Sequence, residues 1–357
     1  MAAKRKYPKM EDLPVIEKLP DVLGGAKTAE EWAERREEIK ELISHYMLGH
    51  RPKTDKKAKG EVLSSTPVYE GAALREEVRI HISKEEYFDI YVIRPADDKK
   101  HPAVVWNYFK GRGECPIEKE LIVERGYVLA AFENNAVCVD NAEAPESPAK
   151  RAYPKADWGA IMIWGWGFSK IIDYLLTTGY VDETRILTSG HSRNGKASLA
   201  AAAFDERVAM AVVNNSGCGG AGCFRFLGDE KQITQDSEKV ESVGTITHVF
   251  PHWFAPELTT FGGQEKPYPV TNENRLPFDL HFLKALVAPR ILYTNEGIDD
   301  VWANTHGAVL TRQAAQPVFD LLGVPGHNIQ TIRDGGHGQE ARDWRLSIDI
   351  ADRLLGK

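Results

Sequence analysis

The sequence predicts an α/β fold, a three-layer sandwich in which helices cover both faces of a mostly parallel central sheet. Most of six short apolar segments are continuous rather than alternating in polarity, as expected of strands that are covered on both faces. Helical patterns separate several of these segments, and strands that alternate with helices form parallel sheets. The third observation is a serine placed between one apolar strand and an alanine-rich helix.

Composition limits the classes of function. The chain has 357 residues with Lys+Arg 45 against Asp+Glu 52, so its formal net charge is −7, and we expect neither a general polyanion binder nor a nucleic-acid partner. A hydrophobic fraction of 42% is enough for a large core. Length alone would allow two domains, but α/β folds often run longer, and we expect one catalytic domain over residues 1–357 that acts as a monomer. Four cysteines are too few for a disulfide scaffold.

The N-terminus has basic residues but no apolar stretch behind them, and no run of some 18 apolar residues occurs anywhere. We therefore expect a soluble chain without a membrane partner. The compartment stays open at this stage: cytoplasmic as the sequence is written, secreted or periplasmic if a leader has been removed.

The N-terminal part, residues 1–58, is expected to be a helical segment that packs on the body. Residues 28–48 place apolar side chains at helical intervals, with Thr28 as the N-cap and Glu31 three residues on. Residues 53–60 read as a solvated basic loop. The stretches 74–82 and 87–95 alternate in polarity and predict antiparallel strands that are half exposed to water.

The body follows after Pro102. The predicted buried strands are residues 103–109, 127–133, 185–190, 208–215, 290–297 and 327–335. The predicted helices are residues 159–179, 196–205, 308–323 and 341–355. A segment from about 224 to 286, rich in Phe, Pro, His and Trp, is too long for a simple connection and is expected to be a pocket or cap insertion.

Ser192 is the most informative residue. It lies where an apolar strand ends and a helix begins, as in a nucleophile elbow, whose geometry exposes the hydroxyl and points the next N–H at an oxyanion. Gly190 occupies the expected small-residue position before the serine. After it, Asn194 stands where a small residue is usual, with Gly195 one further on. An ordinary glycine-containing turn is the alternative interpretation.

Chain order is a stronger test, because α/β-hydrolases present serine, acid and histidine in that order at strand ends. Asp299 and Asp300 follow one predicted strand, and His337 follows the last one. A carboxylate behind the imidazole would select its tautomer and stabilise the imidazolium. Asn214 and Asn215 stand at the other possible acid position, where an amide cannot carry that charge. The acid is therefore Asp299 or Asp300, with the choice open on these grounds.

Several ordered motifs together resemble carbohydrate esterase family 15, the glucuronoyl esterases. They are GHSRNGKASL, NNSGCGGAG, FPHWF, DDVWAN and GGHGQEARDW, and the helix EEWAERREEIKELISHYMLG is also similar to that family. The resemblance implies an α/β-hydrolase fold, no cofactor, and hydrolysis of the ester that joins 4-O-methyl-D-glucuronic acid of glucuronoxylan to lignin alcohols.

The same resemblance implies roles for individual residues. Ser192 matches the nucleophile, His337 the general base, and Asp300 the acid of many bacterial members. Fungal members instead have a Glu at the position of Asn215. Arg193 matches an arginine that assists the oxyanion hole, although a salt bridge for helix packing is an alternative.

Three more residues match substrate-binding positions of that family. Lys196 corresponds to a lysine that binds sugar hydroxyls, with a solvated helix residue as the alternative, and Trp302 to a residue that lines the sugar site. Glu230 resembles a site glutamate, in a local match that is loose by about one residue. Phe250, His252 and Trp253 are also aromatic candidates, but we assign them to packing. Arg193 and Lys196 beside one carboxylate predict a locally positive pocket on an acidic body.

The chain departs from the fungal pattern at His191 and Gly338, where fungal relatives have cysteines that bridge the two loops, so that disulfide cannot form. Cys218 and Cys223 could pair locally, but buried free thiols are the preferred interpretation. No HExxH or CxxC spacing indicates a metal site.

Three functional hypotheses follow. The first is the glucuronoyl esterase with a uronate ester as its substrate. The second is an acetyl or feruloyl esterase, or a peptidase, on the same fold. The third is a non-catalytic carbohydrate-binding relative, motivated by Asn215 at the fungal acid position.

Overall fold

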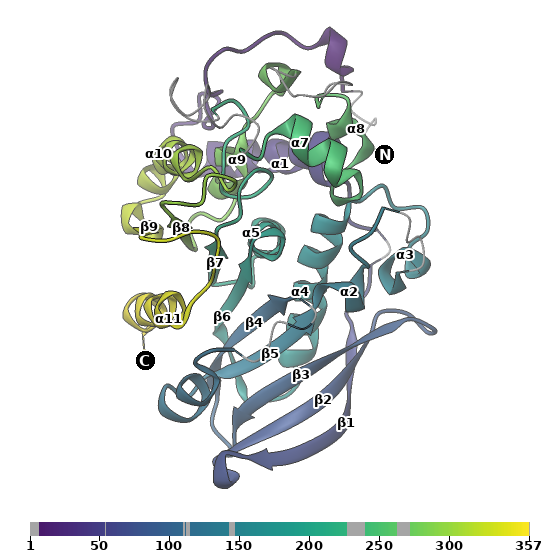
Figure 1. The fold of residues 1–357 in the computed structure, drawn as a ribbon, viewed down its shortest axis with the longest axis vertical. Coiled ribbons are helices and arrows are strands. Elements are labelled where there is room, and N and C mark those ends of the chain that lie inside the picture. Colours follow the sequence, from purple (N-terminus) through teal and green to yellow (C-terminus); the bar gives the residue numbers. More distant parts are fainter. Residues whose placement is uncertain are drawn as a thin grey trace.

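The computed structural model describes residues 7–53, 55–109, 111, 115–142, 147–226, 240–262 and 272–356. One nine-stranded sheet organises them, in the order β1-β2-β3-β5-β4-β6-β7-β8-β9 (Figure 1). The strands are β1 Lys59–Val68, β2 Ala73–His81, β3 Tyr87–Pro95, β4 His101–Tyr108, β5 Val128–Glu133, β6 Val181–His191, β7 Met210–Asn214, β8 Ile291–Gly297 and β9 Asn328–Arg333.

The sheet is antiparallel at one edge and parallel elsewhere. β1, β2, β3 and β5 pair antiparallel in succession, whereas β5, β4, β6, β7, β8 and β9 run parallel. Parallel neighbours need crossover connections, and helices supply several of them here. The predicted mostly parallel sheet is confirmed.

Helices flank the sheet along the chain (Figure 1). They are α1 Ala29–Ile43, α2 Asn134–Val137, α3 Pro148–Ala152, α4 Ala160–Leu175, α5 Arg193–Phe204, α7 Val243–Val249, α8 Pro256–Thr259, α9 Leu280–Ala285, α10 Thr305–Leu321 and α11 Ala341–Leu355. None of the helices in the described ranges is long and apolar enough to cross a membrane.

Two hydrophobic cores lie on opposite faces of the sheet. On β4, Ala103 and Val105 belong to the core that contains α4 and α5, while Val104 and Trp106 belong to the core that contains α11. Successive side chains of a strand point to opposite faces, so this alternation places one core on each side. The sandwich prediction is confirmed, and burial on both faces explains why the strands read as continuous apolar runs.

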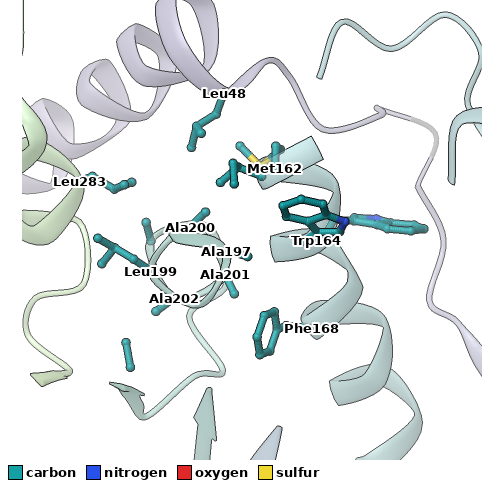
Figure 2. Packing of buried hydrophobic residues seen from close by; sticks show 14 of the residues in the cluster. Leu48, Met162, Trp164, Phe168, Ala197, Leu199, Ala200, Ala201, Ala202 and Leu283 are labelled. Carbon is teal, nitrogen blue, oxygen red and sulfur yellow. The ribbon is translucent and has the colours of Figure 1, made fainter. Parts of the chain in front are cut away.

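Helices α4 and α5 pack closely against each other. Trp164 and Phe168 of α4 face a run of alanines on α5 (Figure 2). A Cβ on Gly165 would lie 3.1 Å from the Ala197 carbonyl oxygen and 3.2 Å from Ala200 Cβ, so only small residues permit this approach. The alanine-rich helix after Ser192 therefore packs tightly against α4, and this packing fixes the position of the turn at Ser192.

The predicted N-cap of the first helix is confirmed, whereas the loop predicted at residues 53–60 is partly wrong. Thr28 and Glu31 form a capping box, with Thr28 Oγ1 accepting from Glu31 N at 3.2 Å. Strand β1 was not predicted, and the predicted basic loop at residues 53–60 runs into its first residues. Nearly every residue of β1 is exposed because it is an edge strand, so it lacks the apolar alternation that identifies a half-buried strand.

The segment proposed as an insertion contributes α7, α8 and α9, which Figure 1 shows gathered with α1 at one end of the molecule. The single-domain organisation and the boundaries of the insertion stay predictions. The four cysteines are buried and free, as expected for Cys218 and Cys223.

Candidate active site

Four parallel strands deliver the proposed site residues to one edge of the sheet. β6 ends at His191, β7 at Asn214, β8 at Gly297 and β9 at Arg333. The carboxyl ends of parallel strands meet at a common edge, so the loops that follow them converge there. Side chains from four distant parts of the sequence are thereby brought together.

Ser192 occupies a sharp turn between β6 and α5. Its backbone has φ 59° and ψ −129°, a conformation that non-glycine residues rarely adopt. Ser192 N donates to the Asn214 carbonyl at 2.9 Å, and its own carbonyl accepts from Lys196 N at 3.1 Å. A Cβ on Gly190 would lie 2.1 Å from the Asn194 carbonyl oxygen. The turn thus requires glycine before the serine, as in a nucleophile elbow, and the departure at Asn194 does not prevent it.

The residues proposed as acid and base come from the loops after β8 and β9. His337 Nδ1–H donates to Asp300 Oδ2 at 2.6 Å, which leaves Nε2 as the basic nitrogen. Asp300 is 4% exposed and also accepts from Asn215 Nδ2 at 2.5 Å. Asp299, in contrast, is exposed and accepts from Gly335 N at 3.2 Å. The geometry brings Asp300 rather than Asp299 to the histidine.

Hydrogen bonds decide the charge state of Asp300. Burial by itself would raise the pKa of this carboxyl, but the hydrogen bonds from His337 and Asn215 outweigh it and lower the pKa. Asn215, which is at the fungal acid position by resemblance, donates to the proposed acid Asp300. An asparagine at this position is therefore compatible with an acid supplied by the loop after β8.

The residues proposed as nucleophile and base, Ser192 and His337, lie on adjoining loops. The ring of His191, which directly precedes Ser192, is 4.4 Å from the ring of His337 between centroids. Within the described ranges, Ser192 Oγ makes no hydrogen bond to His337. Such contacts are often long in free enzymes and tighten when substrate binds.

Arg193 is held by a carboxylate and by aromatic rings. Its Nη1 donates to Asp140, and its guanidinium lies 4.6 Å from the ring centroid of Trp253 and 5.1 Å from that of Phe250. Asp140 also accepts from His252 Nε2 at 2.9 Å and from Trp253 Nε1 at 2.7 Å. The aromatic residues that the sequence assigned to packing thus surround Arg193 at the start of α5.

Asp140 remains ionised in this cluster. Burial would raise its pKa, but hydrogen bonds from His252 and Trp253 and the charge of Arg193 lower it. The salt bridge considered as an alternative role for Arg193 exists, and it links the helix to the segment after β5 rather than to another helix. Asp140 had no signal in the sequence, because its partners are 53 and more positions away.

Lys196 is not a solvated helix residue. It is 2% exposed, and its Nζ donates to the Ser216 carbonyl at 2.5 Å and to Glu241 Oε2 at 2.9 Å. Glu241 also accepts from Cys218 N at 2.8 Å. Burial raises the pKa of the Glu241 carboxyl, while the charge of Lys196 opposes the rise. Since Arg193 and Lys196 each have a carboxylate partner, the predicted excess of positive charge is wrong.

Glu241 was missed by sequence reasoning. It stands in a polar stretch without periodicity, and only the buried Lys196 identifies it. Glu230, which the resemblance suggested instead, lies outside the described residues. Trp302 is 37% exposed, and its carbonyl accepts from Glu241 N at 3.0 Å, so the acid loop and Glu241 are joined through the backbone.

A family profile described as fungal glucuronyl esterase matches residues 80–323, more than half of the chain. The chain belongs to this esterase family. The expectations of a carboxylic ester hydrolase and of carbohydrate esterase family 15 are thereby confirmed.

Individual relatives agree with this assignment. Carbohydrate esterase MZ0003, from an unknown prokaryotic organism, is 29% identical to this chain. The match covers 94% of this chain and 89% of MZ0003. The 4-O-methyl-glucuronoyl methylesterase of Podospora anserina is 30% identical to this chain. The match covers 82% of this chain and 57% of the Podospora protein. A family 15 glucuronoyl esterase structure from Caldicellulosiruptor kristjansonii superposes with a TM-score of 0.77 at 28% identity, covering 98% and 93% of the two chains. The α/β-hydrolase fold is confirmed.

Proposed function

We propose that this esterase hydrolyses the ester between 4-O-methyl-D-glucuronic acid of glucuronoxylan and a lignin alcohol, through an acyl-enzyme on Ser192. The hydrogen bond of 2.6 Å from His337 Nδ1 to Asp300 carries the proposal, because it sets the tautomer that a general base needs beside the elbow. Family membership and relatives named as 4-O-methyl-glucuronoyl methylesterases support the substrate class.

In the first step, Ser192 Oγ attacks the ester carbonyl carbon while His337 Nε2 takes the hydroxyl proton. The imidazolium that results is stabilised by ionised Asp300. Collapse of the tetrahedral intermediate breaks the bond to the alcohol oxygen, which receives the proton from His337. Water, deprotonated by His337, then attacks the acyl-enzyme. The bond to Ser192 Oγ breaks, the proton on His337 passes to Oγ, and the uronic acid is released with both residues restored.

Negative charge develops on the former carbonyl oxygen in both steps. Ser192 precedes the first residue of α5, so the backbone N–H groups of this helix start are available to the oxyanion. Arg193 adds a guanidinium that cannot deprotonate at working pH. Its contacts with Asp140 and Trp253 limit the positions it can adopt, and a donor fixed in advance stabilises a transition state without reorganising.

The sugar ring is proposed to bind next to Lys196, Glu241 and Trp302. Lys196 lies one turn along α5 from Ser192 and pairs with Glu241, whose N donates to the carbonyl of the exposed Trp302. Polar groups and an exposed aromatic residue on adjoining segments suit a sugar, whose hydroxyls need hydrogen bonds and whose ring presents apolar C–H groups. Glu230 stays a proposal of the family resemblance alone.

The test compares hydrolysis of benzyl or methyl D-glucuronate with that of p-nitrophenyl acetate by the wild-type enzyme, with Ser192→Ala as the control for contaminating esterase. We expect a higher kcat/KM for the uronate esters. Faster cleavage of acetate or feruloyl esters would favour the second hypothesis, and absence of hydrolysis of any ester would favour the third. A peptidase would cleave peptide substrates that the esterase leaves intact.

The organisation of the chain is part of the proposal. We infer one catalytic domain that acts as a monomer, with residues 1–58 as a helical N-terminal segment and about 224–286 as an insertion at the pocket. Light scattering of the purified protein tests the monomer.

A further inference from the structure

Arg333 lies between the loop that carries the acid and the loop that carries the base. It is the last residue of β9, and its carbonyl accepts from Ile298 N at 2.8 Å, at the start of the acid loop. Its side chain extends under the base loop. There Nη2 donates to the Gly336 carbonyl at 3.0 Å and to the Gly338 carbonyl at 2.5 Å. These are the residues directly before and after His337.

The base loop has few other constraints. His337 is flanked by Gly335, Gly336 and Gly338, and Gly335 has φ 99°, which only glycine adopts without strain. Glycine leaves many backbone conformations open, and the His337 side chain is 35% exposed, so packing restrains it weakly. The orientation of the imidazole therefore depends on its own hydrogen bond to Asp300 and on polar contacts to the loop backbone.

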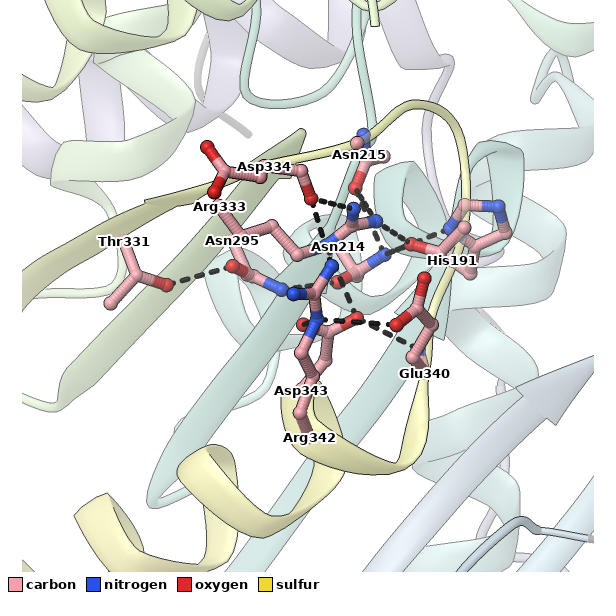
Figure 3. A network of polar contacts seen from close by, with 12 residues as sticks. His191, Asn214, Asn215, Asn295, Thr331, Arg333, Asp334, Glu340, Arg342 and Asp343 are labelled. Atoms are coloured by element: carbon pink, nitrogen blue, oxygen red, sulfur yellow. Dashed lines mark hydrogen bonds and ion pairs between the residues drawn. The ribbon is translucent and has the colours of Figure 1, made fainter. Parts of the chain in front are cut away.

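The guanidinium is itself anchored. Arg333 Nε pairs with Asp343 at 3.3 Å, and both side chains are less than a tenth exposed. Asp343 also caps the start of α11 by accepting from Glu340 N at 2.7 Å. Asn214 Nδ2 makes a second bond to the Gly338 carbonyl, at 2.7 Å. Figure 3 shows Arg333, Asn214 and Asp343 gathered in one network behind the loop.

We propose that Arg333 is a positioning residue for His337: by binding the carbonyls on both sides of the histidine, it holds the imidazole in line with Asp300 and Ser192. This inference rests on the proposed role of His337 as the base. Arg333 touches neither the reacting atoms nor His337's ring nitrogens, so it acts through the loop backbone. The network occupies the place where, by resemblance, fungal relatives have a disulfide between the elbow and the base loop.

The test uses Arg333→Ala with Arg342→Ala as a matched control. Arg342 belongs to the same network and donates to the Asp334 carbonyl at 2.8 Å, but its side chain is 52% exposed and it makes no bond to either carbonyl beside His337. Because misplacing a catalytic group by about 1 Å can cost about 10²-fold in rate, we expect kcat of Arg333→Ala to fall by about that factor, with KM nearly unchanged. Arg342→Ala should keep the wild-type kcat.

A second readout does not depend on turnover. The proton that His337 Nδ1 shares with Asp300 in a short hydrogen bond should give a low-field proton NMR signal, assigned by its loss in His337→Gln. We expect this signal to disappear in Arg333→Ala and to persist in Arg342→Ala, at equal thermal stability. If the wild type cleaves only p-nitrophenyl acetate, the proposed substrate is wrong, but kcat on acetate and the NMR signal still test Arg333.

Arg333→Ala that retains both the wild-type kcat and the NMR signal would overturn the proposal. If that variant does not fold, Arg333→Lys replaces it. Lysine keeps the positive charge, but its single nitrogen cannot bind both carbonyls and Asp343 as two separate guanidinium nitrogens do. A partial loss of kcat and of the signal is expected, and wild-type values of both would equally overturn the proposal.

Discussion

The elbow that carries Ser192 and the loops that carry Asp300 and His337 are held by different kinds of contact. At the elbow, backbone hydrogen bonds fix the turn, and the Asn194 carbonyl lies so close to Gly190 that a side chain there would clash. At the acid and base, side-chain hydrogen bonds from Asn215 and Arg333 join segments far apart in the sequence.

This difference separates two ways of losing activity. Removing a functional group at the elbow should abolish the chemistry while the backbone keeps its shape, because the shape depends on sterics and on main-chain bonds. Removing a polar partner at the proposed acid and base should loosen a geometry that depends on a few side-chain hydrogen bonds. Variants of the two regions can therefore test the comparison.

The largest expected effect is that of Ser192→Ala. Loss of the nucleophile should reduce kcat by about 10⁴–10⁶-fold, since only binding and oxyanion stabilisation remain. Thermal unfolding should be unchanged, because alanine accepts the same backbone strain as serine at φ 59°. Steady-state kinetics on benzyl D-glucuronate measure the loss, and turnover at the wild-type rate would exclude Ser192 as the nucleophile.

Asp300→Asn should follow, with a loss in kcat of about 10⁴-fold, because an amide favours the wrong imidazole tautomer and cannot stabilise the imidazolium. Asp299→Asn is the matched control, since Asp299 is exposed and, among the residues that the structure describes, its carboxylate accepts a hydrogen bond only from Gly335 N. Comparable losses in the two variants would show that the adjacent aspartates are not distinguished as the geometry indicates.

Arg193→Ala should reduce kcat by about 10²–10³-fold, the cost of one oxyanion donor. Asp140→Asn should give a smaller loss by releasing Arg193 from its position, and the double variant should be no slower than Arg193→Ala alone. Additive losses in this double-mutant cycle would mean that Asp140 acts independently of Arg193.

The smallest expected effect concerns pH and stability at the Lys196–Glu241 pair. Because burial raises the pKa of Glu241 in the folded state, the folded state binds the proton more readily than the unfolded state above pH ~4.3. This carboxyl therefore makes the free energy of unfolding fall as pH rises from there through its raised pKa.

The double variant Lys196→Met/Glu241→Gln should remove this part of the pH dependence without leaving an unpaired buried charge. Urea unfolding at several pH values between about 4 and 8 measures the slope. An unchanged slope in the double variant would assign the effect to other groups.

Local patterns account for what could be predicted. The capping box at Thr28, the buried strands, the alanine-rich helix after Ser192 and the order of serine, acid and histidine all depend on neighbouring residues or on strand ends. Strand β1 escaped prediction because an exposed edge strand has no apolar face to reveal it. Sequence reasoning also missed three site residues, Asp140, Glu241 and Arg333. The partners of Asp140 and Glu241 are far away in the chain, and Arg333 binds backbone carbonyls, which no sequence pattern identifies.

The sequence by itself determined the α/β sandwich, the strand–serine–helix turn and the family to which the motifs point, since periodicity and local sterics are written residue by residue. The resemblance pointed to Asp300, and the tertiary structure added the contact that brings Asp300 rather than Asp299 to His337. Only the tertiary structure paired Arg193 with Asp140 and Lys196 with Glu241, and put Arg333 beneath His337. The physical reason is that hydrogen bonds and ion pairs between distant segments depend on orientation and burial, which exist only once the sheet has brought its strand ends together.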